Sequence, residues 1–203
     1  MEIRKDKDIT YEQDRDEDIG LMLRFKSGDN SAFEFLLNKY DKPLINFIYR
    51  FIGNQVDAED LAQEVFLRVY KAKNNYKPQA KFSTWLYKIT SDLCIDYQRK
   101  RKIKTVPLDN PVNTDKAEIV REIPVLDDRT PDTSVEKKQI SETIRSAFLS
   151  LPVNQRIALS LKIYEKKSYK EISKILGCSV SAVESLIFRA RQGLKLKLSD
   201  IVK

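Results

Sequence analysis

Residues 168–198 carry side chains suited to contacts with nucleic acid. After Gly177 the chain reads CSVSAVESLIFRARQ, in which hydroxyl, carboxylate, aromatic and guanidinium groups recur. Groups of these types bind the base edges and phosphates of DNA. We predict that they share the outer surface of one helix, and the set consists of Ser181, Glu184, Ser185, Phe188, Arg189 and Arg191. A helical hairpin with a solvated basic face is the alternative.

A helix-turn-helix would position these groups. Ile172, Ile175 and Leu176 fall on one face of a first short helix, and Gly177 permits the left-handed turn that follows. The second helix repeats apolar residues at helical spacing, namely Val180, Val183, Leu186 and Ile187. We therefore expect the two helices to close a small shared core.

A second set of cations ends a long helix that is predicted to begin near Ser83 or Thr84. Its predicted buried side holds Trp85, Leu86, Ile89, Leu93 and Ile95, and its exposed side holds Lys88, Asp92, Asp96, Gln98, Arg99, Lys100, Arg101 and Lys102. Such a dense basic run favours phosphate contacts, whose strength falls with salt. The aromatic residues Tyr76, Phe82, Trp85 and Tyr87 suit stacking on unpaired bases, but we interpret Phe82 and Trp85 as packing residues.

The stretch AEDLAQEVFLRVYKA predicts a helix with a largely acidic outer face. Its inward positions are Leu61, Val65, Phe66 and Val69, and its outer positions are Glu59, Asp60, Gln63, Glu64 and Arg68. Asp60 and Glu64 lie one turn apart, so a basic protein partner would relieve their repulsion. A solvated helix face is the alternative. A metal-dependent hydrolase built on Glu59, Asp60 and Glu64 lacks histidine ligands and a visible nucleophile.

The net charge of +7 favours an anionic partner, and its distribution divides the 203-residue chain into four blocks. Residues 1–18 carry a net charge of −4, residues 19–104 +7, residues 105–136 −5 and residues 137–203 +9. The acidic block 105–136 holds four of the seven prolines, so we predict an extended acidic linker between two basic domains. It acts either as a plain tether or as a mimic of nucleic acid. We expect the acidic extension 1–18 to be disordered.

Composition argues against several kinds of protein. The chain has no histidine and two cysteines, Cys94 and Cys178, which we expect to be small buried thiols. We therefore predict neither a zinc site nor any other metal or cofactor site. No apolar run approaches the roughly 20 residues of a membrane span, and no secretory signal is visible. We expect a cytoplasmic protein without membrane insertion.

Three blocks resemble the bacterial extracytoplasmic-function (group IV) sigma factors of the sigma-70 family. The blocks are DAEDLAQEVFLRVYKA, then KFSTWLYKITSDLCIDYQRKRK, then LPVNQRIALSLKIYEKKSYKEISKILGCSVSAVESLIFRARQGLK. Their order and separation match the family over most of residues 20–198. The resemblance implies an all-α protein of two small helical domains, domain two at residues 19–104 and domain four at residues 137–203. It implies a non-enzymatic initiation factor that binds core RNA polymerase and both double-stranded and melted promoter DNA.

The resemblance also implies roles for individual residues. Asp60, Gln63 and Glu64 would dock on the coiled coil of the polymerase β′ clamp, and the β flap is a second expected contact. The helix over residues 91–102 would cover the minus-ten element, and the loop 74–81 would receive an extruded base. The expected minus-ten contacts are Lys77, Lys81, Lys88, Asp92, Asp96, Arg99, Lys100 and Arg101.

In the second domain, the helix over residues 179–192 would enter the major groove of the minus-thirty-five element. Ser185, Phe188 and Arg189 would lie nearest the bases and Arg191 near phosphate, with Ser181 and Glu184 also in the expected contact set. The resemblance adds an anti-sigma protein as a candidate inhibitor, which no residue of this chain identifies.

The chain departs from the family pattern at two places that bear on DNA recognition. Asp92 stands where the family usually has asparagine, so a group that donates and accepts becomes an acceptor only. Residues 181–186 read SAVESL in place of the frequent GTVKSR, which removes two cations and adds the carboxylate of Glu184. A helix-turn-helix regulator that binds DNA without polymerase is the other hypothesis, and tight binding of promoter DNA by the free protein would support it.

Overall fold

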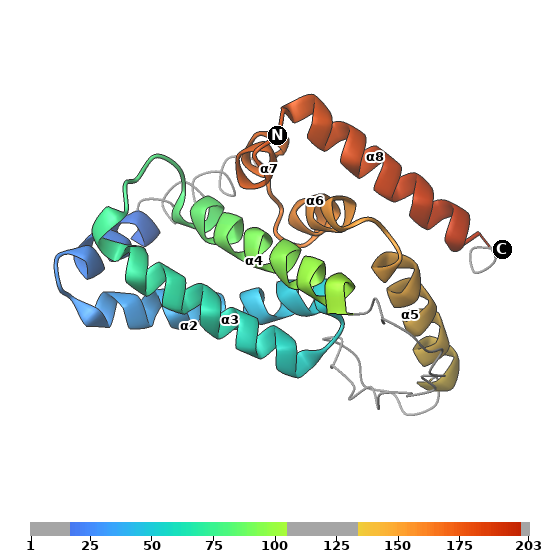
Figure 1. The fold of residues 1–203 in the computed structure, drawn as a ribbon, viewed down its shortest axis with the longest axis horizontal. Helices are drawn as coiled ribbons and strands as arrows, with labels where there is room; N and C mark the ends of the chain where they lie inside the picture. Colours follow the sequence, from blue (N-terminus) through green and yellow to red (C-terminus); the bar gives the residue numbers. More distant parts are fainter. Residues whose placement is uncertain (1–16, 105–133, 200–203) are drawn as a thin grey trace, which may run out of the picture.

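The part of the chain that the structure describes is entirely helical. The computed structural model describes residues 17–104 and 134–199, and these two ranges contain helices and no strand, which confirms the all-α prediction for them (Figure 1). A first helix covers residues 17–26. It is followed by α2 (Asn30–Ile52), α3 (Gln55–Ala72), the 3-10 turn η1 (Lys73–Asn75), α4 (Phe82–Lys104), α5 (Ser134–Leu149), α6 (Val153–Ile163), α7 (Tyr169–Leu176) and α8 (Val180–Lys197).

Capping residues explain where α2 and α3 begin and end. The Asp29 carboxylate accepts hydrogen bonds from the first backbone N–H groups of α2. Gly53, with φ of 81°, ends α2 in the left-handed conformation, and Asn54 caps α3 through the N–H of Asp57. This short connection makes α2 and α3 neighbours, and α4 packs against both. The three helices enclose a core in which Phe47, Phe51 and Leu86 are fully buried, among others.

The helix-turn-helix is formed by α7 and α8. Ser168 and Glu171 make a reciprocal capping box at the start of α7, Gly177 turns the chain with φ of 64°, and Ser179 caps α8. The apolar faces meet in a core that includes Ile172, Ile175, Val183 and Ile187, as predicted. Val180 was expected in this core, but it is 40% exposed because it is the first residue of α8.

The two halves of the chain pack together as one body. α4 contacts α7, and α2 contacts α5 and α6. The buried side chains of both halves form one continuous core cluster. In Figure 1, α6 and α7 lie between α4 and α8, with α3 on the far side of α4. The helices that carry the predicted DNA-binding residues are therefore held in a defined relation to each other.

Two predicted boundaries differ from the helices. Asp18 belongs to the folded body rather than to the N-terminal extension, because its buried carboxylate accepts hydrogen bonds from Lys39 and Tyr40. α5 begins at Ser134, inside the stretch assigned to the linker, which ends at residue 136. The predictions for residues 1–16 and 105–133 lie outside the described residues.

The left-handed turn at Gly177 predicts a specific cost of substitution. We expect Gly177→Ala to lower the free energy of unfolding by about 1 kcal/mol, because a side chain disfavours positive φ even though open space surrounds this position. Gly20 also has open space but lies inside a helix without positive φ, so Gly20→Ala should stabilise the protein by about 0.5–1 kcal/mol. Urea unfolding of both variants measures these changes. Shifts of the same sign would contradict the conformational explanation.

Candidate nucleic-acid interface

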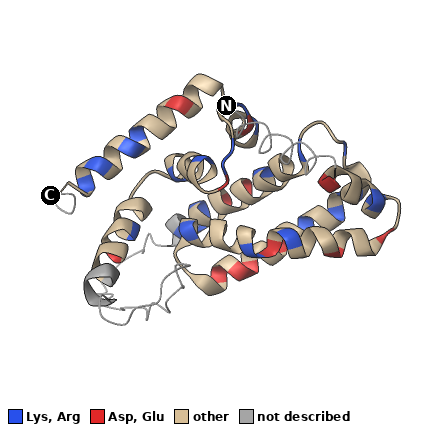
Figure 2. Cartoon of the chain, turned by 180° about the vertical axis from the view of Figure 1, so that it is seen from behind, with Lys and Arg blue, Asp and Glu red and all other residues tan. Residues whose placement is uncertain are grey.

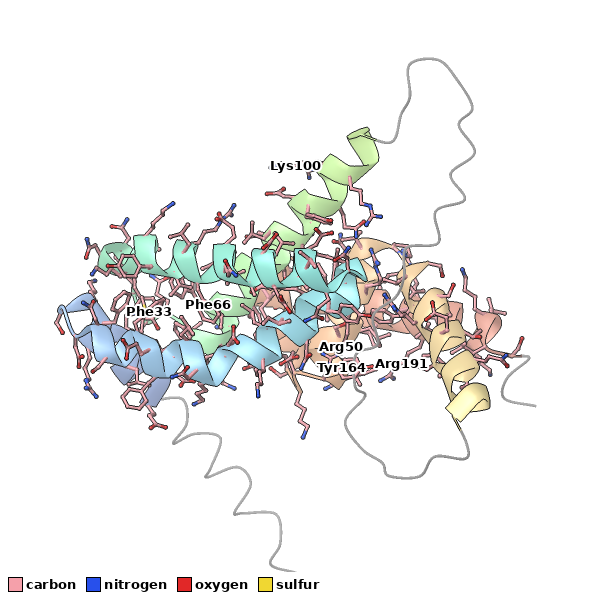
Figure 3. The ribbon with its side chains drawn as sticks, turned by 90° about the horizontal axis from the view of Figure 1, so that it is seen from below. Phe33, Arg50, Phe66, Lys100, Tyr164 and Arg191 are labelled. Carbon is pink, nitrogen blue, oxygen red and sulfur yellow. The ribbon has the colours of Figure 1, made fainter. Side chains whose placement is uncertain are left out.

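The basic end of α4 projects away from the helices around it, as the position of Lys100 shows (Figure 3). The opposite side of the helix is buried in the core, where it contributes Leu86, Leu93 and Cys94. The predicted contacts on α4 are all exposed, and they are Lys88, Asp92, Asp96, Arg99, Lys100 and Arg101. One side of α4 is thus fixed by the core while the other is open to a polyanion.

Two carboxylates interrupt the cationic face of α4. Asp96 lies 4.0 Å from a guanidinium nitrogen of Arg99 in an exposed pair, which contributes little to stability. Partial burial raises the pKa of Asp92. The positive charge of Lys88 reduces this increase, and the negative charge of Asp96 adds to it. The attraction for phosphate is therefore strongest beyond these residues, at positions 99–101.

Aromatic packing supports the loop between α3 and α4. Tyr76 is nearly buried, and its ring centroid lies 5.0 Å from that of Trp85 and 6.5 Å from that of Phe82. Phe82 is buried and Trp85 is half-buried against it, which confirms their interpretation as packing residues. Of the two predicted cations here, Lys77 is exposed, whereas Lys81 forms an ion pair with Glu171 of α7 at 2.6 Å.

The outer face of α8 presents the predicted mixture of groups to solvent. Phe188 is 62% exposed, an unusual position for an aromatic side chain unless a partner covers it. The Ser185 hydroxyl donates to the backbone carbonyl of Ser181 at 3.0 Å and keeps acceptor capacity for a base. All six residues of the predicted set are exposed: Ser181, Glu184, Ser185, Phe188, Arg189 and Arg191.

The outer face of α3 combines an acidic edge with an apolar groove. Asp60 and Gln63 are exposed, and Glu64 pairs with Arg68 at 2.9 Å, so part of the repulsion predicted between Asp60 and Glu64 is balanced within the helix. Figure 2 shows the acidic residues along this helix. Beside them a cavity of about 340 Å³ lies between α2 and α3, where Figure 3 shows Phe33 and Phe66. Its lining residues are Phe33, Leu37, Asp41, Gln63, Phe66, Leu67 and Tyr70.

Within residues 17–104 and 134–199, no three cysteine, aspartate or glutamate side chains are grouped in a way that could hold a metal ion. Likewise, no helix there is both long enough and apolar enough to cross a membrane. Cys94 is buried as expected, but Cys178 is only half-buried at the turn before α8.

No pattern in the sequence predicts the charged residues that join the two halves. Arg156, Glu165 and Lys167 belong to the second half, and each of them interacts with a residue of the first half. Of these residues, the sequence indicates only Arg156, because it is the single cation of the mainly apolar stretch RIALSL. The partners of these residues lie far away in the sequence, so no local pattern reveals them.

Both halves of the chain match known proteins. A model of sigma-70 region 2 matches residues 36–103, and a model of sigma-70 region 4 matches residues 141–194. The chain is 32% identical to the RNA polymerase sigma-H factor of Pseudomonas aeruginosa over 196 residues, covering 96% of this chain and 98% of that protein. It is 35% identical to the ECF RNA polymerase sigma factor SigW of Bacillus subtilis over 176 residues, covering 87% and 94%.

The fold is also similar to a solved structure. That structure is the sigma factor RpoE in complex with the anti-sigma factor NepR from Bartonella quintana. The TM-score is 0.61 at 20% sequence identity, and the similarity covers 82% of this chain and 96% of the other.

The ionised form of Glu171 should stabilise the fold in a pH-dependent way. Burial alone raises the pKa of Glu171, but hydrogen bonds from Lys81 and Ser168 outweigh it and hold the pKa at about 2. Because the folded pKa lies below the unfolded value near 4.3, the contribution is complete above pH ~5 and is lost as the pH falls towards 2. Glu171→Gln should therefore cost about 1 kcal/mol at pH 7 and almost nothing near pH 2. Unfolding measured across this pH range tests it, and a cost independent of pH would contradict the assignment.

Proposed function

Because the chain belongs to the extracytoplasmic-function group of the sigma-70 family and directs RNA polymerase to promoters without catalysing a reaction itself, we propose that three of its helices divide this task. α3 holds the polymerase, α4 with the loop before it meets the minus-ten element, and α8 meets the minus-thirty-five element. The observation that carries this division is that each helix buries one face in the common core and exposes a face of different chemistry.

The polymerase surface combines the acidic edge of α3 with the groove beside it. Asp60, Gln63 and Glu64 would face the coiled coil of the β′ clamp, since carboxylates steer a basic partner and fix its orientation. Leu67 and Tyr70, both close to half exposed, offer apolar anchoring area at the same place. We assign a second polymerase contact, to the β flap, to the exposed Ile140 and Ile144 of α5 and Leu196 of α8.

The minus-ten surface runs from the loop 74–81 to the exposed end of α4. Lys77 and the cations at positions 99–101 would bind phosphates, while Asp92 would accept a hydrogen bond from a base or sugar. A base extruded from the non-template strand would lie against the loop, whose aromatic support Tyr76 and Trp85 provide. Extrusion costs a few kcal/mol, so a rigid receiving surface is an advantage.

The minus-thirty-five surface is the exposed face of α8. Its N-terminal half would enter the major groove, with Ser185, Phe188 and Arg189 nearest the bases and Arg191 at a phosphate. Phe188 suits the methyl group of thymine, and Arg189 suits the acceptor edge of guanine. Glu184 would accept from a cytosine amine. Ser181, at the start of the helix, would contact the backbone.

The helix bounds suggest domain two at residues 17–104 and domain four at residues 134–199. Residues 105–133 would join them and follow the RNA path inside the polymerase, where an acidic segment takes the place of nucleic acid. The protein would act in the cytoplasm with the polymerase. The Bartonella quintana relative was solved with an anti-sigma factor, and we propose an inhibitor of this class for the present chain.

The assignment of α8 predicts that base-reading residues affect transcription but not polymerase binding. Arg189→Ala and Phe188→Ala should each lower transcription from a cognate promoter by about 10- to 100-fold, since one good base contact contributes about 1–3 kcal/mol. Lys42→Ala, which removes an exposed charge from α2, is the matched control for Arg189→Ala. Equal loss of core polymerase binding in the α8 variants would contradict this division of labour.

The assignment of α3 predicts that a change on its acidic face weakens polymerase binding. Glu64→Lys should weaken capture of core polymerase by about tenfold or more, because it reverses the charge offered to a basic surface. The pair between Glu64 and Arg68 contributes only about 0.3–0.5 kcal/mol, so the fold should persist. A pull-down titration measures the affinity, with Glu17→Lys as the control for an exposed charge elsewhere. Unchanged capture by Glu64→Lys would count against the α3 surface.

A further inference from the structure

The first helix, residues 17–26, lies at the same end of the molecule as η1 and the loop between α3 and α4 (Figure 1). The match to sigma-70 region 2 begins at residue 36, after this helix. The ammonium group of Lys26, its last residue, donates to the backbone carbonyl of Tyr76 at 2.9 Å, across 50 positions of the sequence. This hydrogen bond therefore ties the segment that we propose to receive an extruded base to an element outside the loop.

The end of the first helix is itself fixed to the start of α2. Arg24 donates two hydrogen bonds to one carboxylate oxygen of Asp29, at 2.7 and 3.0 Å. The other oxygen of Asp29 accepts from the first backbone N–H groups of α2. A hydrogen bond from the Ser31 hydroxyl, together with those from Arg24, holds the pKa of Asp29 at about 2. Lys26 therefore extends from a turn whose course is set on both sides.

A second contact joins the first helix to the chain just before the loop. The ammonium group of Lys73, in η1, lies 4.8 Å from the ring centroid of Phe25 and 5.1 Å from that of Tyr70. The face of an aromatic ring attracts a cation at such distances. Because Phe25 is fully buried, its ring is a fixed point of contact. The first helix therefore holds this part of the chain at two neighbouring residues, Lys73 and Tyr76.

The side chain of Tyr76 is held by packing and its backbone by hydrogen bonds. The ring lies against Trp85, and among the described residues its buried hydroxyl has no hydrogen-bond partner. Burial, and then the charge of Asp18, raise the pKa of Tyr76 to about 12, so the hydroxyl stays neutral. The Tyr76 N–H donates to the carbonyl of Lys73 within η1 at 3.2 Å. The carbonyl of Tyr76 is thus the polar group through which the first helix orients this residue.

We propose that Lys26 is a positioning residue for the loop 74–81, because its hydrogen bond to Tyr76 keeps this loop in the conformation that receives the extruded base. This inference rests on the proposed role of the loop. Ordering a free loop when the base arrives would add the conformational entropy of the loop to the cost of extrusion. Loss of the hydrogen bond from Lys26 therefore weakens base reception and leaves the polymerase surface on α3 unchanged.

Hydrogen exchange tests the tether without any assumption about function. Lys26→Met keeps an unbranched side chain and removes the donor. In the full chain it should speed exchange of the backbone amides in residues 74–81 by about tenfold, since a hydrogen bond to a charged group can shift a local equilibrium by that factor. Lys42→Met makes the same substitution at an exposed site on α2 and should leave these amides unchanged. Equal exchange in the two variants would overturn the proposal.

Binding of single-stranded promoter DNA by the assembled holoenzyme tests the consequence for base reception. The probes are an oligonucleotide with the non-template sequence of a cognate promoter and versions with an abasic site at each minus-ten position in turn. Wild type should bind the version without the extruded base more weakly. Lys26→Met should lose about tenfold in affinity for the intact probe and very little for that abasic one. Lys26→Arg keeps donor groups and should recover most of the loss.

The outcomes separate this inference from the function on which it rests. If no abasic site weakens binding by wild type, the proposed role of the loop is wrong and the inference falls with it. If wild type and Lys26→Met distinguish the intact and abasic probes equally well, only the positioning role is wrong. An equal loss of affinity on all probes would make Lys26 a direct phosphate contact and would likewise overturn the positioning role.

Discussion

Buried charges in the second half of the chain determine how the two halves pack. Arg156, Glu165 and Lys167 lie where water cannot solvate them fully, and each finds its partner on α2 or α4. A hydrogen bond to a charged group typically contributes about 1.5–3 kcal/mol. These contacts therefore fix the orientation of one half relative to the other, because hydrogen bonds and ion pairs are directional. Apolar contact alone does not constrain orientation in this way.

This packing distributes the functional surfaces over the molecule. Figure 1 places α3 and α8 on opposite sides of α4. The acidic edge of α3 is exposed beside its apolar groove, while Asp92 of α4 and Ser185 and Arg189 of α8 line one cleft on the other side of α4.

The sequence predicts the local structure well and the long-range pairing poorly. Periodic apolar residues such as Ile172 and Ile187, with Gly177 between them, were enough to predict the helix-turn-helix, because caps and helical period are local properties. The same helical period predicted which residues of α3 and α4 are exposed. The contact between Arg156 and Phe51 spans 105 residues, and that between Tyr87 and Glu165 spans 78. No local pattern encodes such pairs.

Run-off transcription with purified core RNA polymerase and a library of genomic fragments decides whether this chain directs the enzyme to promoters. Addition of the chain should yield transcripts from a small set of discrete start sites, preceded by two shared elements at the separation typical of minus-thirty-five and minus-ten sequences. Transcripts that are the same with and without the chain would show that it does not select promoters.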